Sequence, residues 1–188
     1  LIKDLREKLN EKEKATATLT YLKYEKMKDE MQKLEMHGGP DDYLENLDGL
    51  IGIQEFGNSF KLSKNPSLLH VDGLQNLTRV DKYLSIVLND VLQDLDGLSS
   101  LERVDGTLVI EDNWDLVHVD GLENLRHIGG SIDIGYNDVL SNLDGLQNLE
   151  TVAGYLSISE NLLLQNIDGL QGISYIQGQL HIDGNESL

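Results

Sequence analysis

The sequence predicts an α/β solenoid of about six coils, preceded by a long N-terminal α-helix. Three observations indicate this organisation. The tripeptide Asp-Gly-Leu recurs with a strict 24-residue period from Asp48 to Asp168. Apolar residues occupy fixed places in each of these 24-residue units. Residues 1–36 lie outside the repeat, contain neither Gly nor Pro, and have a different charge balance from the remainder.

The overall composition excludes several classes of function. The 188 residues include 15 Lys and Arg against 33 Asp and Glu, a formal net charge of −18 that repels nucleic acid phosphates. No apolar run approaches the ~20 residues of a membrane-spanning helix. The absence of Cys excludes disulfides and thiolate metal sites. We therefore expect no nucleic acid, no membrane span and no cofactor. Because the chain begins at Leu1 without a visible signal peptide, we treat it as part of a longer protein.

Residues 1–36 are predicted to form one long helix. Nine basic and eight acidic residues nearly balance in this segment, and most of its residues are helix formers. Apolar residues follow a 3-then-4 rhythm in two runs, from Ile2 to Leu9 and from Tyr24 to Leu34. A helix with such a stripe must bury it. Two arrangements remain open: a coiled-coil stalk that joins two or three copies of the chain, or a cap packed on the solenoid.

The repeat domain is predicted over residues 44–188, after a Gly- and Pro-containing linker at 37–43. We number each unit from its Asp, position 1, to position 24. Positions 3, 6, 9, 13, 15, 21 and 24 are apolar in every unit that contains them. Such strict periodicity is typical of a solenoid whose coils bury their inner side chains against their neighbours. Alternation at positions 13 and 15, as in Leu84 and Ile86, predicts a short strand in each coil and hence a parallel sheet.

Two polar positions are also constant, and each is predicted to stabilise a turn. The Asp at position 1 is expected to cap the helical turn that follows by accepting backbone N–H groups. These residues are Asp48, Asp72, Asp96, Asp120, Asp144 and Asp168. The Asn at position 18 has donors and an acceptor, so a stacked column can satisfy buried backbone groups. These residues are Asn65, Asn89, Asn113, Asn137, Asn161 and Asn185. Gly at position 11 in four units predicts a turn with positive φ.

The repeat unit resembles known repeats. The segment Leu84-Ser-Ile-Val-Leu-Asn89 resembles the core of a leucine-rich repeat. The fuller unit, Gly-x-Leu-x-Ile-x-x-Asn followed by Leu-Asp-Gly-Leu-x-Asn-Leu, is similar to the receptor L-domain type repeats of bacterial surface proteins. The resemblance covers about residues 44–188, although Leu92 follows Asn89 by three places and not by two. It implies a right-handed coil and a binding scaffold, commonly extracellular, and it identifies no ligand.

The variable outward positions are the candidate ligand-binding residues. On the strand face, Tyr83 and Tyr155 lie in a small mixed surface that either binds a protein or sugar or is plain solvated sheet. Just past each strand, positions 17, 19 and 20 bring apolar side chains together on the outside of the coil. These side chains are Leu88, Val91, Trp114, Tyr136, Val139, Leu162 and Leu163. Either they form a contact site, or some of them fold inward around the turn.

Two other columns carry charged or ligating side chains. Position 8 stacks Arg79, Arg103 and His127, with Arg126 alongside. These residues either dock a carboxylate or sulfate of a partner, or pair with acids two places along, Asp81 and Asp105. Position 23 stacks His70, Asp94 and His118. The two His are two coils apart, about 10 Å, which is too far to share one zinc ion. We predict no metal site and, since no catalytic constellation is visible, no enzyme activity.

The sequence therefore predicts a non-enzymatic binding or adhesion module. In this interpretation an oligomeric stalk presents one solenoid per chain, and several linked solenoids bind a protein or glycan ligand at a cell surface with raised avidity. The alternative is an intracellular or periplasmic protein–protein interaction scaffold with the helix packed as a cap. An extracellular or bacterial cell-surface location is favoured over the cytoplasm.

Overall fold

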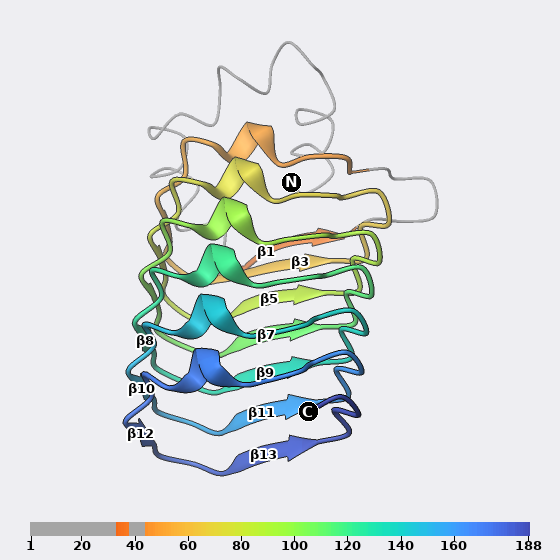
Figure 1. Cartoon of the computed structure of the whole chain (residues 1–188). Coiled ribbons are helices and arrows are strands. Elements are labelled where there is room, and N and C mark those ends of the chain that lie inside the picture. The colour runs from red at the N-terminus through yellow and green to blue at the C-terminus, as the bar shows by residue number, and fades with distance from the viewer. Residues whose placement is uncertain (1–32, 38–43) are drawn as a thin grey trace.

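The computed structural model describes residues 44–188 and, as backbone only, residues 33–37. The chain from residue 44 onward winds through six stacked coils, which confirms the predicted solenoid. Each coil contributes a turn of 3-10 helix, a two-residue strand and a longer strand. In Figure 1 the turns lie in one file at the front, and the two-residue strands lie at the left edge. None of the helices in the described part is long and apolar enough to cross a membrane.

Two parallel sheets line the stack. Sheet A has seven strands in the order β1-β3-β5-β7-β9-β11-β13. Its strands are β1 (Lys33–His37), β3 (Ser59–Ser63), β5 (Leu84–Val87), β7 (Leu108–Glu111), β9 (Ile132–Gly135), β11 (Leu156–Ser159) and β13 (Leu180–Asp183). Sheet B has six strands in the order β12-β10-β8-β6-β4-β2. Its strands are β2 (Glu55–Phe56), β4 (Arg79–Val80), β6 (Arg103–Val104), β8 (His127–Ile128), β10 (Thr151–Val152) and β12 (Tyr175–Ile176). Neighbouring strands from β3 to β13 are offset by one whole repeat unit, so equal positions stack.

The core is the column of inward apolar side chains. Leu84 and Ile86 of β5 are 0% exposed, and the same holds for most inward positions of coils 1 to 5. In coil 6, Leu180 and Ile182 are 56% and 37% exposed because no described coil covers their outer side. Burial of a side chain in this fold therefore depends on a coil on either side of it.

Each Asp-Gly-Leu forms one turn of 3-10 helix. The turns are η1 (Asp48–Leu50), η2 (Asp72–Leu74), η3 (Asp96–Leu98), η4 (Asp120–Leu122), η5 (Asp144–Leu146) and η6 (Asp168–Leu170). The predicted capping role of these Asp residues is wrong, because each is the first residue of its turn and makes no side-chain cap. In four of the six turns the acceptor stands two places earlier, at position 23. Asn142 Oδ1 accepts a hydrogen bond from the Asp144 N–H at 3.0 Å, and Asn46, Asp94 and Asn166 do the same in their coils.

The Gly residues allow the coils to approach one another closely. A Cβ added to Gly121 of η4 would lie 1.8 Å from the carbonyl oxygen of Leu95, the residue immediately before the neighbouring turn η3. The predicted positive φ at position 11 is wrong, since Gly184, at position 17, is the one described Gly with a positive φ. Gly106 at position 11 is required for proximity instead, because its Cβ would lie 2.4 Å from the carbonyl oxygen of Lys82.

Residues Lys33–His37 form strand β1, which pairs in parallel with β3 at the end of sheet A. The predicted helix over residues 1–36 is therefore wrong for its last four residues, and the predicted linker at 37–43 begins inside the strand. The rest of these predictions, residues 1–32 and 38–43, lies outside the described residues. The predicted coiled-coil stalk and helical cap lie there too.

The local sequence explains strand β1. Leu34 and Met36 alternate with polar residues and are in register with Phe60 and Leu62 of β3. Alternation over so short a segment is hard to distinguish from helical spacing, because Leu34 also continues a 3-then-4 pattern. The 24-residue period would pair Phe60 with residue 36, but Phe60 pairs with Leu34. The period of the sequence therefore did not predict strand β1. The strand of a further coil therefore precedes coil 1.

Candidate functional site

The chain leaves every strand of sheet A from β3 to β13 through a residue in the left-handed conformation. Position 17 has a positive φ of 53° to 59° in five coils and of 65° at Gly184. The five residues without the freedom of Gly are Lys64, Leu88, Asp112, Tyr136 and Glu160. The left-handed conformation costs such a residue about 1–2 kcal/mol. It turns the backbone sharply at the end of the sheet, and the side chain of the next residue, Asn, lies in the core.

The predicted Asn column is confirmed and fixes this edge. Asn137 is 0% exposed, and its backbone N–H donates to Oδ1 of Asn161 in the next coil at 3.2 Å. Its Nδ2 donates to the carbonyl oxygens of Ile110 and Gly135, both at 2.9 Å, and to Asn161 Oδ1 at 3.2 Å. Similar hydrogen bonds recur from Asn65 to Asn185. The residues on either side of the Asn are therefore held on a rigid frame.

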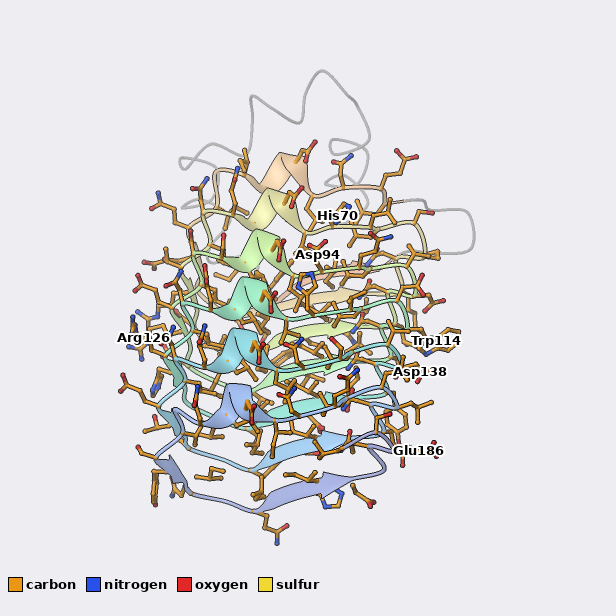
Figure 2. All side chains as sticks on the ribbon, viewed as in Figure 1. His70, Asp94, Trp114, Arg126, Asp138 and Glu186 are labelled. Atoms are coloured by element: carbon orange, nitrogen blue, oxygen red, sulfur yellow. The ribbon has the colours of Figure 1, made fainter. Side chains whose placement is uncertain are left out.

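The apolar candidates past the strands lie together on this edge, which we call the rim. It comprises positions 17, 19 and 20 of coils 2 to 6. Trp114, Tyr136 and Leu163 are 52%, 51% and 50% exposed. The other four, which are half-buried, are Leu88, Val91, Val139 and Leu162. None of the seven folds fully into the core. Figure 2 shows Trp114 projecting from the edge beside Asp138.

The two candidate tyrosines of the sheet face do not join the rim. Tyr83 and Tyr155 stand at position 12, before β5 and β11, at the opposite end of the strands from the rim. They are three coils apart, about 14 Å at the spacing of parallel strands. Tyr83 is half-buried and Tyr155 is 44% exposed. The Tyr155 hydroxyl donates a 3.4 Å hydrogen bond to Asp133 Oδ2.

The sheet face also carries a carboxylate pair, Glu111 and Asp133, that sequence reasoning did not single out. Burial raises the pKa of Glu111, and the charges of Asp133 and Asp112 raise it further. Burial, together with the charge and hydrogen bond of Asp133, also raises the pKa of Tyr155. The sequence contains so many acidic residues that Glu111 and Asp133 do not stand out as a candidate site. Only the register of the sheet shows that they lie on adjacent strands, β7 and β9. The one indication in the sequence was that Glu111 is an acid at position 16, where neighbouring coils have Val, Gly and Ser.

The Arg residues of sheet B are paired, as one of the two open interpretations predicted. Arg79 Nε lies 2.9 Å from Asp81 Oδ1 and donates to Asp105 Oδ2 at 3.0 Å. Arg103 Nε donates to Asp105 Oδ1 at 2.7 Å. Burial alone would raise the pKa of Asp105, but the hydrogen bonds and charges of both Arg outweigh it and hold that pKa below its ordinary value. Arg126 and His127 have no such partner within the described residues.

The two His residues of position 23 lie beside carboxylates, either of the Asp at position 23 in the next coil or of the Asp at position 1 in the 3-10 turns. His70 Nδ1 lies 2.8 Å from Asp94 Oδ2, and Figure 2 shows the two side chains next to each other. His118 Nδ1 lies 3.5 Å from Asp120 Oδ2 and 3.9 Å from Asp96 Oδ1. Residues 44–188 contain no group of three or more His, Cys, Asp or Glu that could hold a metal ion.

The comparisons with known proteins agree with the architecture. Residues 124–188 match the model of the Receptor L domain family. This match covers most of coil 4 and all of coils 5 and 6, and the same unit continues back to Asp48. The chain matches no curated protein and no solved structure. The family match and the stacked parallel strands together identify a repeat protein similar to leucine-rich repeats and receptor L domains.

Proposed function

Residues 44–188 form a receptor L-domain-like repeat array, and from this premise we propose that the protein is a non-enzymatic module that binds a protein or glycan ligand through the rim. The observation that carries the proposal is the half exposure of three large side chains on one edge, Trp114, Tyr136 and Leu163. Exposed apolar clusters of this kind are typical of contact sites.

The rim suits recognition because its backbone is already ordered. Each of the three side chains lies within two places of a buried Asn, so little backbone freedom is lost when a ligand binds. Leu88 and Leu162 flank the two aromatic residues in the neighbouring coils and extend the apolar area. Tyr83 and Tyr155 on the sheet face provide polar-tipped rings for a larger ligand that also covers part of sheet A.

A binding screen on the full chain tests the proposal. We expect ligands from glycan and protein arrays whose binding falls at least about tenfold in Trp114→Ala and Tyr136→Ala, since anchor residues of this type dominate interfaces. Tyr175→Ala is the matched control, because Tyr175 is 60% exposed but belongs to sheet B in coil 6. A ligand whose affinity falls equally in the control, or not at all in the rim variants, contradicts the assignment of the site.

The proposal extends to assembly and location. The two apolar runs that begin at Ile2 and at Tyr24, within the predicted stalk over residues 1–36, support a dimer or trimer formed through the part of that segment before β1, which would raise avidity. Resemblance to repeats of bacterial surface proteins supports an extracellular or cell-surface site of action in adhesion. Light scattering on the full chain should give twice or three times the mass of one chain. A monomer at every concentration contradicts the assembly and leaves ligand binding at the rim untouched.

A further inference from the structure

Acidic and apolar side chains alternate along the rim. At position 19 the successive coils 2 to 6 present Asp90, Trp114, Asp138, Leu162 and Glu186. Position 17 alternates in the opposite sense from coil 2 to coil 5, with Leu88, Asp112, Tyr136 and Glu160. Position 20 adds Asp115 in the coil of Trp114. Each exposed ring therefore has carboxylates in its own coil or in the coils above and below it.

The carboxylates of the rim have no basic partner within the described residues. They are Asp90, Asp112, Asp115, Asp138, Glu160 and Glu186. None of these six acids forms an ion pair with another described residue, whereas Asp81 and Asp105, which directly follow strands β4 and β6 of sheet B, are both paired with Arg. From residue 104 to the end the chain has a single Arg, Arg126, and no Lys. Figure 2 shows Arg126 at the edge opposite Trp114, Asp138 and Glu186. The rim therefore has an uncompensated negative potential around its aromatic rings.

The acids of position 19 also have a regular spacing. Asp90, Asp138 and Glu186 are two coils apart, and parallel strands stack at about 4.8 Å, so these acids recur about every 9.6 Å along the axis. A polyproline II segment has three residues per turn and a rise of about 3.1 Å per residue, so one of its faces recurs about every 9.3 Å. A β-strand presents side chains on one face about every 6.6 Å, which does not match.

We propose that the rim binds a basic polypeptide segment in the polyproline II conformation, lying along the solenoid axis with Lys or Arg at every third residue. The basic side chains pair with Asp90, Asp138 and Glu186, and the group paired with Asp90 or Asp138 also lies on the face of Trp114, which stands between these two acids. This inference rests on the proposed function, because it names the class of ligand for the same rim.

Two other ligand classes fit the rim less well. A neutral glycan stacks on aromatic rings and donates hydroxyl hydrogen bonds to carboxylates, but it carries no charge to balance six of them, and an acidic glycan is repelled by them. A calcium site requires several oxygen ligands to converge on one point. The described residues contain no such group of three acids, and the rim acids are instead distributed along the axis.

The experiment uses the full chain and three synthetic peptides. The first consists of repeated Pro-Pro-Arg units long enough to span coils 2 to 6, about 19 Å. The second has the same composition with its arginines contiguous, and the third has Glu in place of Arg. Binding is followed by the fluorescence of Trp114, the chain's single Trp, and by calorimetry. We expect the first peptide to bind at least about tenfold more tightly than the second, and the third not to bind. Raising the ionic strength from about 0.05 M to about 0.5 M should weaken the complex.

Matched variants locate the contact. The triple variant Asp90→Asn, Asp138→Asn, Glu186→Gln should reduce affinity at least about tenfold, since exposed ion pairs are each modest but three are lost. The triple variant Glu102→Gln, Glu123→Gln, Glu150→Gln removes the same charge from exposed residues elsewhere and should bind as the unaltered chain does. Equal losses in both triple variants, equal binding of the two Arg peptides, or no binding of either overturns the inference.

The outcome also separates this inference from the proposed function. If array ligands depend on Trp114 and Tyr136 while the Pro-Pro-Arg peptide does not bind, the rim is a binding site for another class of ligand and this inference is wrong. If calcium alone changes the fluorescence of Trp114 and the peptide does not, the acids serve a cation and the inference is again wrong. If neither peptide nor array ligand depends on the rim, both proposals fail.

Discussion

At the scale of single residues, the buried amide of position 18 has the largest structural role. Asn137 donates to two backbone carbonyls, from Ile110 in the preceding coil and from Gly135 in its own. Its Oδ1 also accepts from the backbone N–H and Nδ2 of Asn113. The short side chain and the combination of donors and acceptor explain why the same residue type recurs in all six units.

Replacing this amide should be costly. We expect Asn137→Ala to lower the free energy of unfolding by about 3 kcal/mol, because several buried polar groups lose partners together. Asn124→Ala is the control, since Asn124 is exposed and its Nδ2 donates a hydrogen bond to the carbonyl oxygen of Ser99. It should cost about 1 kcal/mol or less. Urea unfolding of the two variants measures the difference, and equal losses contradict the role of the column.

The half-buried acid of sheet A should make stability depend on pH. The pKa of Glu111 is raised in the fold by burial and by Asp133 and Asp112, so the folded state holds this proton more tightly than the unfolded state. Its contribution is favourable below the ordinary pKa of 4.5 and is lost as the pH rises through the raised value. Glu111→Gln should therefore raise the Tm near pH 7, and the gain should disappear near about pH 3, where both states are protonated.

A matched substitution checks that this effect is local. Glu123→Gln removes the same charge from an exposed position on the turn side of the coil. Thermal unfolding of both variants at the two pH values compares them. A Tm gain in Glu123→Gln as large as that in Glu111→Gln would indicate a general effect of net charge and not of the environment of Glu111.

At the scale of elements, the 3-10 turns set how closely the coils stack. In coils 2 to 6 a Cβ on the Gly of the turn would lie 1.7 to 2.1 Å from the carbonyl oxygen of the residue that immediately precedes the neighbouring turn. The Asp of the same tripeptide is exposed and makes no cap. The repeated Asp-Gly-Leu is therefore explained most directly by the close approach that its Gly allows.

This explanation predicts that Ala substitution lowers the stability of the chain much more at Gly121 than at Gly52. Gly121→Ala should destabilise the chain by about 3 kcal/mol or more, because backbone must move to admit the Cβ. Gly52→Ala should change stability by less than about 1 kcal/mol, since nothing lies within 4 Å of its Cβ. Denaturant unfolding compares the two variants. A small cost at Gly121 would mean that the turns do not determine the stacking distance.

The elements that could be predicted from the sequence are those whose residue pattern recurs in every 24-residue unit. The strands at positions 13 and 15 and the inward Asn follow from periodicity alone. The left-handed residue of position 17 was missed, because Lys64, Leu88 and Tyr136 share no chemistry and only the backbone reveals the conformation. The second sheet was missed because its strands are so short. The rim cluster was predicted from spacing, but its unpaired charge needed the structure.

At the scale of the whole molecule, stability is a sum over neighbouring coils. Each strand of sheet A pairs with the strands of the adjacent coils, from β1 at one end to β13 at the other. Phe60 and Leu62 of β3 are fully buried, and β1 pairs with β3 on its outer edge. We infer that β1 protects the first coil in the same way as each later coil protects its neighbour.

Removing β1 should expose one end and leave the middle intact. Deletion of residues 1–37 should reduce the protection of β3 amides in hydrogen exchange at least about tenfold, with β7 and β9 unchanged, because coupling extends only to neighbours. Deletion of residues 1–32 keeps β1 and serves as the control. Loss of protection through the entire array, or equal protection of β3 in both truncations, contradicts a local role for this strand.

The uniform register of the coils has a consequence for the history of such chains. Because each coil meets its neighbours through the same Gly approach, Asn amide and apolar rows, duplication of one unit within the gene inserts a coil that fits on both sides at once. Ancestors could therefore lengthen or shorten by whole units without redesigning the interior. Selection then needed to change only the outward-facing residues. Neighbouring copies of the unit could diverge in this way into the alternating acidic and apolar residues of the present rim.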